Sequence, residues 1–435
     1  MSDKGLKIVW LCTISNSQIY SHIKFSTWNL KKIAKHILGQ SIPKFKERAQ
    51  WNTNAIRVFE TFRDIKLTVI FPYMGIEGNT QQFSINGIDY ICYRTDDDSL
   101  FSSIKKKISK KNSEYPRARK IVKSLIEEIK PDIVHIIGAE NPNYSICALD
   151  VPKDIPCVVS LQTLMSEPSF KKNYPIDEES YQYRSCIEQE ILKRSDYIAS
   201  RIKVYNTYIK EHIKTDAIFL QMPLAVGVDV NIEPSKKEYD FVYFANNINK
   251  AADDAIEAFA LAYNVKSSLT LNISGSYDDS FRLNLEKRIK ELGMEKNVFI
   301  TGSKQTHDEV IEQIKKSRFA VLPLKVDLIS STVREAMACG LPVVTTITPA
   351  TPNFNKELEC VLLSEKGDYQ AMADNMLRLV DDEAFASEIR KNAILTVQEK
   401  YSNEKFMNMW RKAYYEIVEN FKNGTPFSDD VIYNG

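Results

Sequence analysis

The stretch that decides the fold is residues 323–344, which reads PLKVDLISSTVREAMACGLPVV. The apolar residues 319–323 predict a strand, and a polar loop with three hydroxyl residues leads into a helix that opens at about Val333. Gly340 ends this helix, and residues 341–346 are typical of a buried parallel strand. At the start of such a helix, unpaired N–H groups and the helix dipole both favour an anion.

Two acidic residues, Asp327 and Glu335, lie on either side of this anion site. Carboxylates add nothing to the binding of a bare phosphate, but they accept hydrogen bonds from paired hydroxyls, so the pattern favours a phosphate that carries sugars at both ends. The segment resembles the acidic-x7-Glu signature of retaining GT-B glycosyltransferases, the glycosyltransferase family 4-like group (glycosyl transferases group 1). Asp327 stands where glutamate is usual, and the residues that match the signature are Glu335, Ala336, Ala338, Gly340, Pro342, Val343 and Val344.

The resemblance assigns each part of a nucleotide-sugar donor to a residue. Glu335 would bind the ribose hydroxyls, and Asp327 would bind the donor sugar. The departing diphosphate would be stabilised by Lys250 and by the helix N-terminus at Ser331 and Thr332. The alternative is a buried helix whose acidic residues only cap and solvate it.

The basic pair that the family places near the diphosphate is only half present. Lys250 matches its lysine, while the arginine is missing and Asn246 or Asn247 lies nearest its place. Gly275 and Gly302, which follow the predicted strands, complete the expected donor-binding set. An ordinary surface lysine at a helix start is the alternative for Lys250.

Composition places the chain among soluble globular proteins. Its 435 residues predict two or three domains, with 43% hydrophobic and 26% charged residues. Seven cysteines stand without CxxC pairs, which favours reduced thiols over disulfides or a zinc site. The sequence contains no apolar run long enough to span a bilayer, and its polar start is unlike a signal peptide, so we expect a cytoplasmic protein.

Charge is distributed unevenly along the chain. Residues 1–225 carry 33 Lys and Arg against 25 Asp and Glu, a net charge of +8, and residues 226–435 carry 25 against 32, a net charge of −7. The basic excess is concentrated in residues 24–48 and 105–130. A basic half indicates attraction to an anionic surface or acceptor. A solvated lysine-rich helix explains residues 105–111 equally well.

Strand and helix patterns alternate twice, with a charged linker between the two series. This predicts an α/β protein of the GT-B class: two doubly wound, Rossmann-like parallel sheets that face a cleft. We expect an N-terminal acceptor-side domain over residues 1–230, a nucleotide-sugar domain over 231–405, and a C-terminal helix and tail over 406–435. An apolar stripe suits this last helix for crossing back to the first domain, although it would serve equally as a coat over the second: Phe406, Met409, Trp410, Ala413 and Ile417.

The first domain contains two further candidates for catalytic residues. Residues 131–140, PDIVHIIGAE, resemble the family's Pro-Asp-x-Val-His strand. His135 matches its first histidine, while Ile137 stands where many members have a second. Glu140 is the candidate for binding an acceptor hydroxyl. Packing inside the fold is an equal alternative for His135.

Two segments depart from the family near the first strand. Residues 13–17, TISNS, contain none of the usual glycines, so hydroxyl groups and Asn16 are the candidate donors to the donor phosphates. An insert follows at about residues 20–48, in which Trp28, Ile33 and several lysines could form a basic amphipathic helix on an anionic membrane. A lid packed on its own domain is the alternative.

Together these patterns predict a retaining, hexosyltransferase-type enzyme. It would move a sugar from a nucleotide-diphosphate sugar to a glycan or lipid-linked acceptor in cell-surface polysaccharide or glycolipid synthesis, with no obligatory metal or other cofactor. Nucleic acid is an unlikely partner because the pI is about 7.5 and no basic-aromatic motif occurs. The alternatives are a non-catalytic GT-B subunit and another nucleotide-sugar enzyme, and hydrolysis of the donor by the purified protein would separate the subunit from the enzymes.

Overall fold

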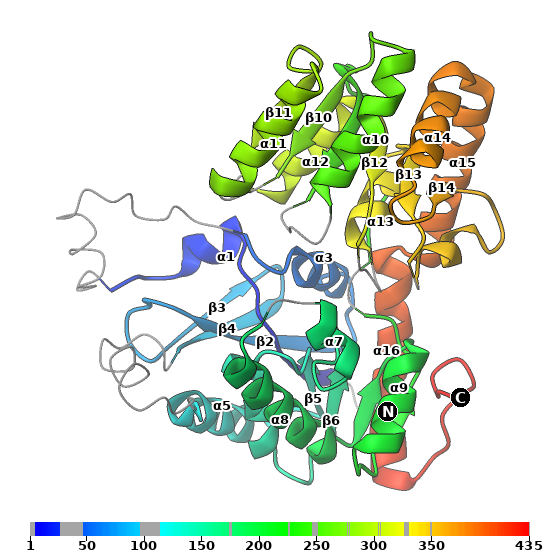
Figure 1. The fold of residues 1–435 in the computed structure, drawn as a ribbon. Coiled ribbons are helices and arrows are strands. Elements are labelled where there is room, and N and C mark those ends of the chain that lie inside the picture. Colours follow the sequence, from blue (N-terminus) through cyan, green and yellow to red (C-terminus); the bar gives the residue numbers. More distant parts are fainter. Residues whose placement is uncertain are drawn as a thin grey trace. The chain divides into compact units, whose positions relative to one another are not determined.

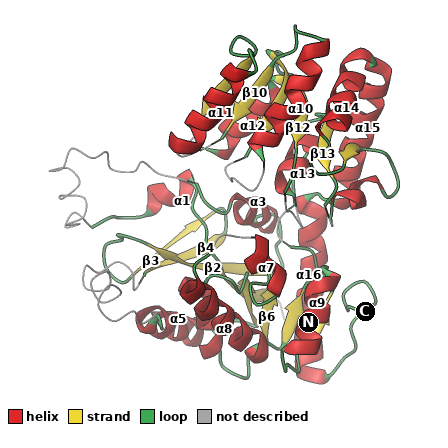
Figure 2. Cartoon of the chain, in the orientation of Figure 1, coloured by secondary structure: helices red, strands yellow, loops and turns green. Residues whose placement is uncertain are grey.

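The chain forms two compact units, one consisting of Met1–Val226 and Phe406–Gly435 and the other of Gly227–Lys405 (Figure 1). The computed structural model describes residues 5–26, 47–95, 114–173, 176–224, 227–245, 251–275, 277, 279–302, 304, 306–325, 330–348 and 350–434. Most of the predicted insert, including Trp28 and Ile33, lies outside these residues. Helices flank the strands of each sheet (Figure 2).

The first unit contains an eight-stranded sheet in the order β3-β4-β2-β1-β5-β6-β7-β8. Every neighbouring pair is parallel except β3 and β4. Its strands are β1 (Leu6–Leu11), β2 (Ile65–Tyr73), β3 (Thr80–Ile85), β4 (Ile88–Arg94), β5 (Ile133–Ile137), β6 (Cys157–Ser160), β7 (Tyr197–Ala199) and β8 (Ile218–Leu220). Its helices are α1 (Ser17–His22), α3 (Gln50–Phe59), α5 (Pro116–Ile129), α6 (Pro142–Ser145), η2 (Ile146–Asp150), α7 (Pro168–Asn173), α8 (Glu178–Arg194), α9 (Lys203–His212) and α16 (Asn403–Asn423), whose first three residues belong to the second unit.

Local sequence explains several of these boundaries. Helix α5 begins with Pro116 in its first turn and ends at Ile129. Its C-cap, Lys130, adopts a left-handed conformation just before Pro131. The antiparallel strand β3, which the strand pattern did not predict, is joined to β4 by Asn86 and Gly87 with φ of 49° and 84°. An Asn-Gly pair between two strands favours a tight hairpin, so this dipeptide was the signal for β3.

The second unit contains a six-stranded parallel sheet in the order β11-β10-β9-β12-β13-β14. Its core includes Phe241 and Phe319, on neighbouring strands, whose ring centroids lie 5.4 Å apart. The strands are β9 (Tyr239–Phe244), β10 (Leu271–Ser274), β11 (Val298–Gly302), β12 (Ser317–Leu322), β13 (Val343–Thr346) and β14 (Val361–Ser364). The helices are α10 (Ala252–Val265), α11 (Asp279–Glu291), α12 (His307–Lys315), α13 (Ser331–Ala338), η4 (Thr351–Asn355), α14 (Tyr369–Asp381) and α15 (Glu383–Lys400).

From Phe406 onward the last helix, α16, packs on the first unit. The indole of Trp410 donates a hydrogen bond to the carbonyl of Pro223 (2.7 Å), and that of Trp10 on β1 donates to the hydroxyl of Tyr414 (2.8 Å). Trp410 and Tyr414 are both fully buried. The predicted fold class, two parallel-sheet α/β domains with a long C-terminal helix that returns to the first, is therefore confirmed.

Within the described part of the chain, every helix is too short or too polar to cross a membrane.

Candidate functional site

The second sheet changes winding direction between β9 and β12. From β9 the chain adds β10 and β11 on one side, and from β12 it adds β13 and β14 on the other. Ligands of such folds bind beyond the carboxyl ends of the strands at this switch point. Residues 246–250 and 326–329, which follow β9 and β12, lie outside the described residues. They include four predicted site residues, whose roles stay predictions: Asn246, Asn247, Lys250 and Asp327.

Helix α13 begins at the carboxyl end of β12, as the sequence pattern predicted. Its N-cap is Ser330, whose hydroxyl accepts the N–H of Val333 (3.3 Å) and lies 3.3 Å from the hydroxyl of Thr332. The helix therefore opens at Ser331, two residues before the predicted start. Ser331 and Thr332 form its first turn, where the N–H groups and the positive end of the dipole favour an anion.

The other end of α13 is closed by Gly340, which has φ of 68°. The N–H of Gly340 donates to the carbonyl of Met337 (3.0 Å), and that of Leu341 donates to the carbonyl of Ala336 (3.0 Å), which is a Schellman motif. A residue without a Cβ adopts this conformation without strain. Both ends of the helix that carries Glu335 are therefore fixed by local hydrogen bonds.

Glu335 lies on the second turn of α13, with its side chain 19% exposed. Its Oε1 is 3.8 Å from Nε2 of His307, a histidine that the sequence analysis did not select. His307 is the first residue of α12, and a capping box between Thr306 and Glu309 fixes that helix start. The Thr-x-x-Glu pattern, which begins four residues after β11, was the signal for a helix start at this edge of the sheet.

Gly275 and Gly302 lie together at the carboxyl edge of the second sheet. The N–H of Gly275 donates to the carbonyl of Gly302 (3.1 Å). A Cβ on Gly275 would stand 2.2 Å from the carbonyl oxygen of Ala245, so this position needs glycine for close backbone approach. Gly302 has φ of +70° and open space around it, so its requirement is conformational. Their predicted role in donor binding remains a prediction.

A cation near the switch point was also not selected from the sequence. Lys325 follows β12, and its Nζ lies 2.9 Å from Oδ2 of Asp253 in the first turn of α10. Both side chains are about half exposed, so the pair contributes little to stability. It nevertheless places a positive charge beside the strand ends where the family's arginine is missing.

His135 lies inside the first unit and not at its surface. Its side chain is 1% exposed, and its ring nitrogens lie 2.7 Å from the hydroxyls of Tyr414 and Ser160. Its ring packs 4.4 Å from that of Trp410, and burial lowers the pKa of His135 to about 3. These surroundings support the alternative, packing of α16 on the sheet, and the catalytic role of His135 stays a prediction.

Glu140 lies in the loop after β5, at the carboxyl edge of the first sheet. The guanidinium of Arg184 on α8 donates two hydrogen bonds to the backbone carbonyl of Glu140 (2.9 and 2.7 Å). Burial raises the pKa of the Glu140 carboxyl to about 7. A carboxyl group that changes protonation near neutral pH at a strand end is a candidate for binding or proton transfer.

The glycine-free loop after β1 uses its polar side chains internally. Oδ1 of Asn16 accepts the N–H of Ile19 and so caps α1, while its Nδ2 donates to the hydroxyl of Thr53 (3.2 Å). The carbonyl of Thr13 accepts from the amide of Asn52 (2.9 Å). The side chain of Asn16 therefore caps α1 and bonds to Thr53, contacts that the prediction of Asn16 as a donor to phosphate did not include.

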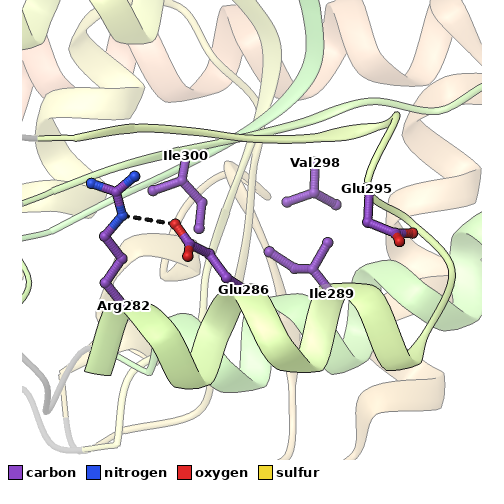
Figure 3. Close-up of a pocket in the computed structure, with 6 residues that line it drawn as sticks. All are labelled: Arg282, Glu286, Ile289, Glu295, Val298 and Ile300. Atoms are coloured by element: carbon purple, nitrogen blue, oxygen red, sulfur yellow. Dashed lines mark hydrogen bonds and ion pairs between the residues drawn. The ribbon is translucent and has the colours of Figure 1, made fainter. Parts of the chain in front are cut away.

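A cavity of about 260 Å³ lies between α11 and the edge strand β11 (Figure 3). Arg282 and Glu286, which line it, are joined by a hydrogen bond of 2.8 Å. The predicted site residues that the structure describes are not among the residues that line this cavity. Within the described ranges, His, Cys, Asp and Glu side chains do not gather in groups of three or more that could hold a metal ion.

Comparison with known proteins agrees with this geometry. Residues 229–396 match the family described as Glycosyl transferases group 1. N-acetyl-alpha-D-glucosaminyl L-malate synthase of Bacillus anthracis is 25% identical over 222 residues, which cover 51% of this chain and 55% of that protein. Poly(ribitol-phosphate) alpha-N-acetylglucosaminyltransferase of Staphylococcus aureus is 25% identical over 218 residues, which cover 49% of this chain and 41% of that protein. The matches thus span only about half the length of these relatives.

Solved structures share the fold of the whole chain. Sucrose-phosphate synthase from Thermosynechococcus elongatus superposes with a TM-score of 0.63 at 15% identity, covering 95% of this chain and 99% of that chain. Anabaena HepE in complex with UDP superposes with a TM-score of 0.60 at 12% identity, covering 95% and 100%. Both confirm the two-sheet architecture, and the family match lies on the unit that carries Glu335. The chain therefore has the GT-B fold, and its second unit contains the region that matches the glycosyl transferases group 1 family.

Proposed function

We propose that this chain is a retaining glycosyltransferase that moves a sugar from a UDP-sugar to a hydroxyl group of a cell-surface polysaccharide or glycolipid. The observation that carries the proposal is α13, which begins at the carboxyl end of β12, beside the switch point of the second sheet. This helix offers an anion site at its N-terminus and a carboxylate, Glu335, on its next turn.

The proposed roles follow from the chemistry of the donor. A carboxylate accepts hydrogen bonds from both ribose hydroxyls, which is the role of Glu335. The diphosphate that leaves carries the charge that must be stabilised, and Lys250 and the N-terminus of α13 supply positive potential for it. Asp327 binds the donor sugar. Lys325, held by Asp253, is a further positive charge beside the same strand ends.

Relatives support the choice of nucleotide and stereochemistry. HepE was solved with UDP, and the names of both relatives specify N-acetylglucosaminyl transfer with an α linkage. UDP-sugars of this kind are themselves α-linked, so an α product means retention. We therefore propose UDP-N-acetylglucosamine as the first donor to test.

We propose that transfer requires no metal ion, since Lys250 and the helix N-terminus provide the positive charge that a metal would supply. Addition of EDTA is then expected to leave the transfer rate unchanged. Loss of transfer on chelation, restored by a divalent cation, would contradict this part of the proposal.

We also propose that the acceptor is presented at an anionic membrane surface. The support is the net charge of +8 over residues 1–225, because each Lys or Arg near an anionic leaflet contributes about 1 kcal/mol. The attraction would place a cytoplasmic enzyme at the inner face of the membrane without requiring a membrane-spanning segment.

A thermal-shift screen of nucleoside diphosphates and nucleotide sugars tests the proposal. UDP and UDP-N-acetylglucosamine are expected to raise Tm, since a ligand at 100 times its Kd adds about 2.7 kcal/mol of stability. ADP and GDP serve as matched controls. A purified protein whose Tm is unchanged by every nucleotide would contradict the proposal and favour the non-catalytic GT-B subunit.

A further inference from the structure

The loop that follows β5 lies at the switch point of the first sheet. Strand β1 pairs with β2 on one side and with β5 on the other. From β1 the chain adds β2, β4 and β3 on one side, and from β5 it adds β6, β7 and β8 on the other. Gly138, the first residue after β5, has φ of +91°. A Cβ at this position would stand 2.6 and 2.7 Å from the two carboxyl oxygens of Glu140. The carboxyl group of Glu140 therefore lies directly against the end of β5, where a doubly wound sheet binds its ligand.

The backbone of this loop is held by hydrogen bonds from two helices. The hydroxyl of Ser145 donates to the carbonyls of Ala139 (2.9 Å) and Asn141 (2.8 Å), and Arg184 donates twice to the carbonyl of Glu140. In contrast, Oε2 of Glu140 is buried and has no hydrogen-bond partner among the described residues. A buried polar atom without a partner costs about 1–3 kcal/mol, so a ligand hydroxyl that hydrogen-bonds to this oxygen would remove that cost.

Helix α8 supports the next loop as well. Glu188, one turn after Arg184, is fully buried, and its two carboxyl oxygens accept the N–H groups of Met165 (3.0 Å) and Ser166 (2.8 Å) in the loop after β6. One face of α8 thus fixes two neighbouring loops at the carboxyl edge of the sheet. This gives Glu140 a defined position before any ligand binds.

The charged groups around Glu140 act on its protonation in opposite directions. The pKa of Glu140 is raised to about 7, mainly by burial and in part by the charge of Glu188, while the charge of Arg184 acts to lower it. Burial also raises the pKa of Glu188 to about 7. A further titratable neighbour is Tyr144 of α6, whose hydroxyl donates to the carbonyl of Ile137 (2.6 Å).

We propose that Glu140 binds a neutral hydroxyl of the acceptor, and that Arg184 and Glu188 are positioning residues that hold the two loops around it. The inference rests on the proposed function, because it takes the first unit as the acceptor side. A hydroxyl can accept from a protonated carboxyl and donate to an ionised one, so it suits Glu140 in both states. A phosphate or carboxylate would be repelled by the ionised form.

Acceptor specificity is the first test. Transfer from UDP-N-acetylglucosamine is measured to neutral compounds (ribitol and methyl glycosides) and to anionic ones (L-malate and glycerol phosphate), with binding of each followed by saturation-transfer NMR in the presence of UDP. The neutral compounds are expected to bind and react. Glu140→Ala should raise their KM about three- to tenfold, the loss of one hydrogen bond, without changing the Kd for UDP. Glu140→Gln, which keeps a hydrogen-bonding group, should have an acceptor KM close to that of the wild type.

The outcomes separate the inference from the proposed function. The inference about Glu140 would be overturned if only the anionic compounds bound, if no compound bound, or if Glu140→Ala left the acceptor KM unchanged. In each of these cases, binding of UDP by the wild type would still support the proposed function. A wild-type protein that binds no nucleotide and transfers to no acceptor would overturn both. Thermal melting of each variant identifies a loss that reflects unfolding.

A pH profile tests the positioning residues. The acceptor KM of the wild type is expected to fall as pH rises through about 7, because a charge-assisted hydrogen bond is stronger than a neutral one. Arg184→Gln removes a positive charge and should move the midpoint up, whereas Glu188→Gln removes a negative charge and should move it down. Glu140→Gln should abolish the pH dependence. Glu190→Gln, an exposed change on the same helix, is the matched control and should leave the profile unchanged.

A merely structural role for α8 would lower the stability of both variants without moving the midpoint. Midpoints that move in the same direction, or do not move, would therefore overturn the positioning roles.

Discussion

Replacing Glu335 by alanine tests the donor site most sharply at a single residue. The side chain is 19% exposed, so hydrogen bonds from the ribose hydroxyls would form in a largely desolvated environment. Hydrogen bonds to a charged group contribute about 1.5–3 kcal/mol, so we expect Glu335→Ala to weaken UDP binding roughly 10- to 150-fold. The fold should survive, because both ends of α13 are fixed by Ser330 and Gly340.

The assay is isothermal titration calorimetry with UDP and with 2′,3′-dideoxyuridine diphosphate. The wild type should bind the dideoxy ligand about as weakly as the variant binds UDP, and the variant should not distinguish the two ligands. Glu383→Gln is a matched control, since Glu383 is 70% exposed and pairs with Arg318 at the amino end of β12. Unchanged UDP affinity in the folded variant, or an equal loss for the dideoxy ligand, would refute the assignment of Glu335.

Three further predictions concern the remaining parts of the proposal. Asp327→Asn should leave UDP affinity nearly unchanged and lower transfer sharply, as shown by calorimetry and a transfer assay; equal loss of affinity for UDP and for the UDP-sugar would place Asp327 at the nucleotide end. The protein should bind anionic vesicles less strongly as salt rises, and the double change Trp28→Ser with Ile33→Ser should weaken binding further; a protein that ignores such vesicles at low salt would leave residues 24–48 as a lid. His135→Ala should lower the free energy of unfolding by about 2–4 kcal/mol, because it leaves a cavity and removes the hydrogen bonds to the hydroxyls of Tyr414 and Ser160, while UDP affinity stays constant. The pKa of His135 is lowered from 6.5 to about 3, so the free energy of unfolding of the wild type should fall as the pH is lowered from about 6.5 to about 3, and that of the variant should not fall for this reason. A stable variant without transfer would instead make His135 catalytic.

The sequence predicted those features that depend on neighbouring residues. The patterns predict a helix over residues 383–400 and a strand over residues 133–137. Helix α15 and strand β5 have these boundaries, because their apolar residues lie between clear start and stop signals. The strand–loop–helix unit around Glu335 was likewise predictable, since its N-cap, its glycine and the following strand lie within one short stretch. The family signature then gave the acidic residues their roles.

Features that depend on distant contacts could not be predicted in the same way. The environment of His135 is set by Tyr414, which lies 279 positions further along the chain. The proximity of His307 to Glu335 depends on how α12 and α13 pack at one edge of the sheet, and the support of Glu140 depends on Arg184 of α8. The sequence showed Asn16 as a polar residue in the loop after β1, but only the structure shows that its side chain caps α1.

The central claim is that the chain transfers a sugar from a UDP-sugar with retention of configuration, and the stereochemistry of the product tests it most directly. The protein is incubated with UDP-N-acetylglucosamine and an accepted neutral acceptor, and the anomeric proton of the product is followed by NMR from the start of the reaction. We expect an α-linked product that forms at a rate proportional to the protein concentration. A β-linked product, or an absence of transfer from every UDP-sugar by a folded protein, would contradict it.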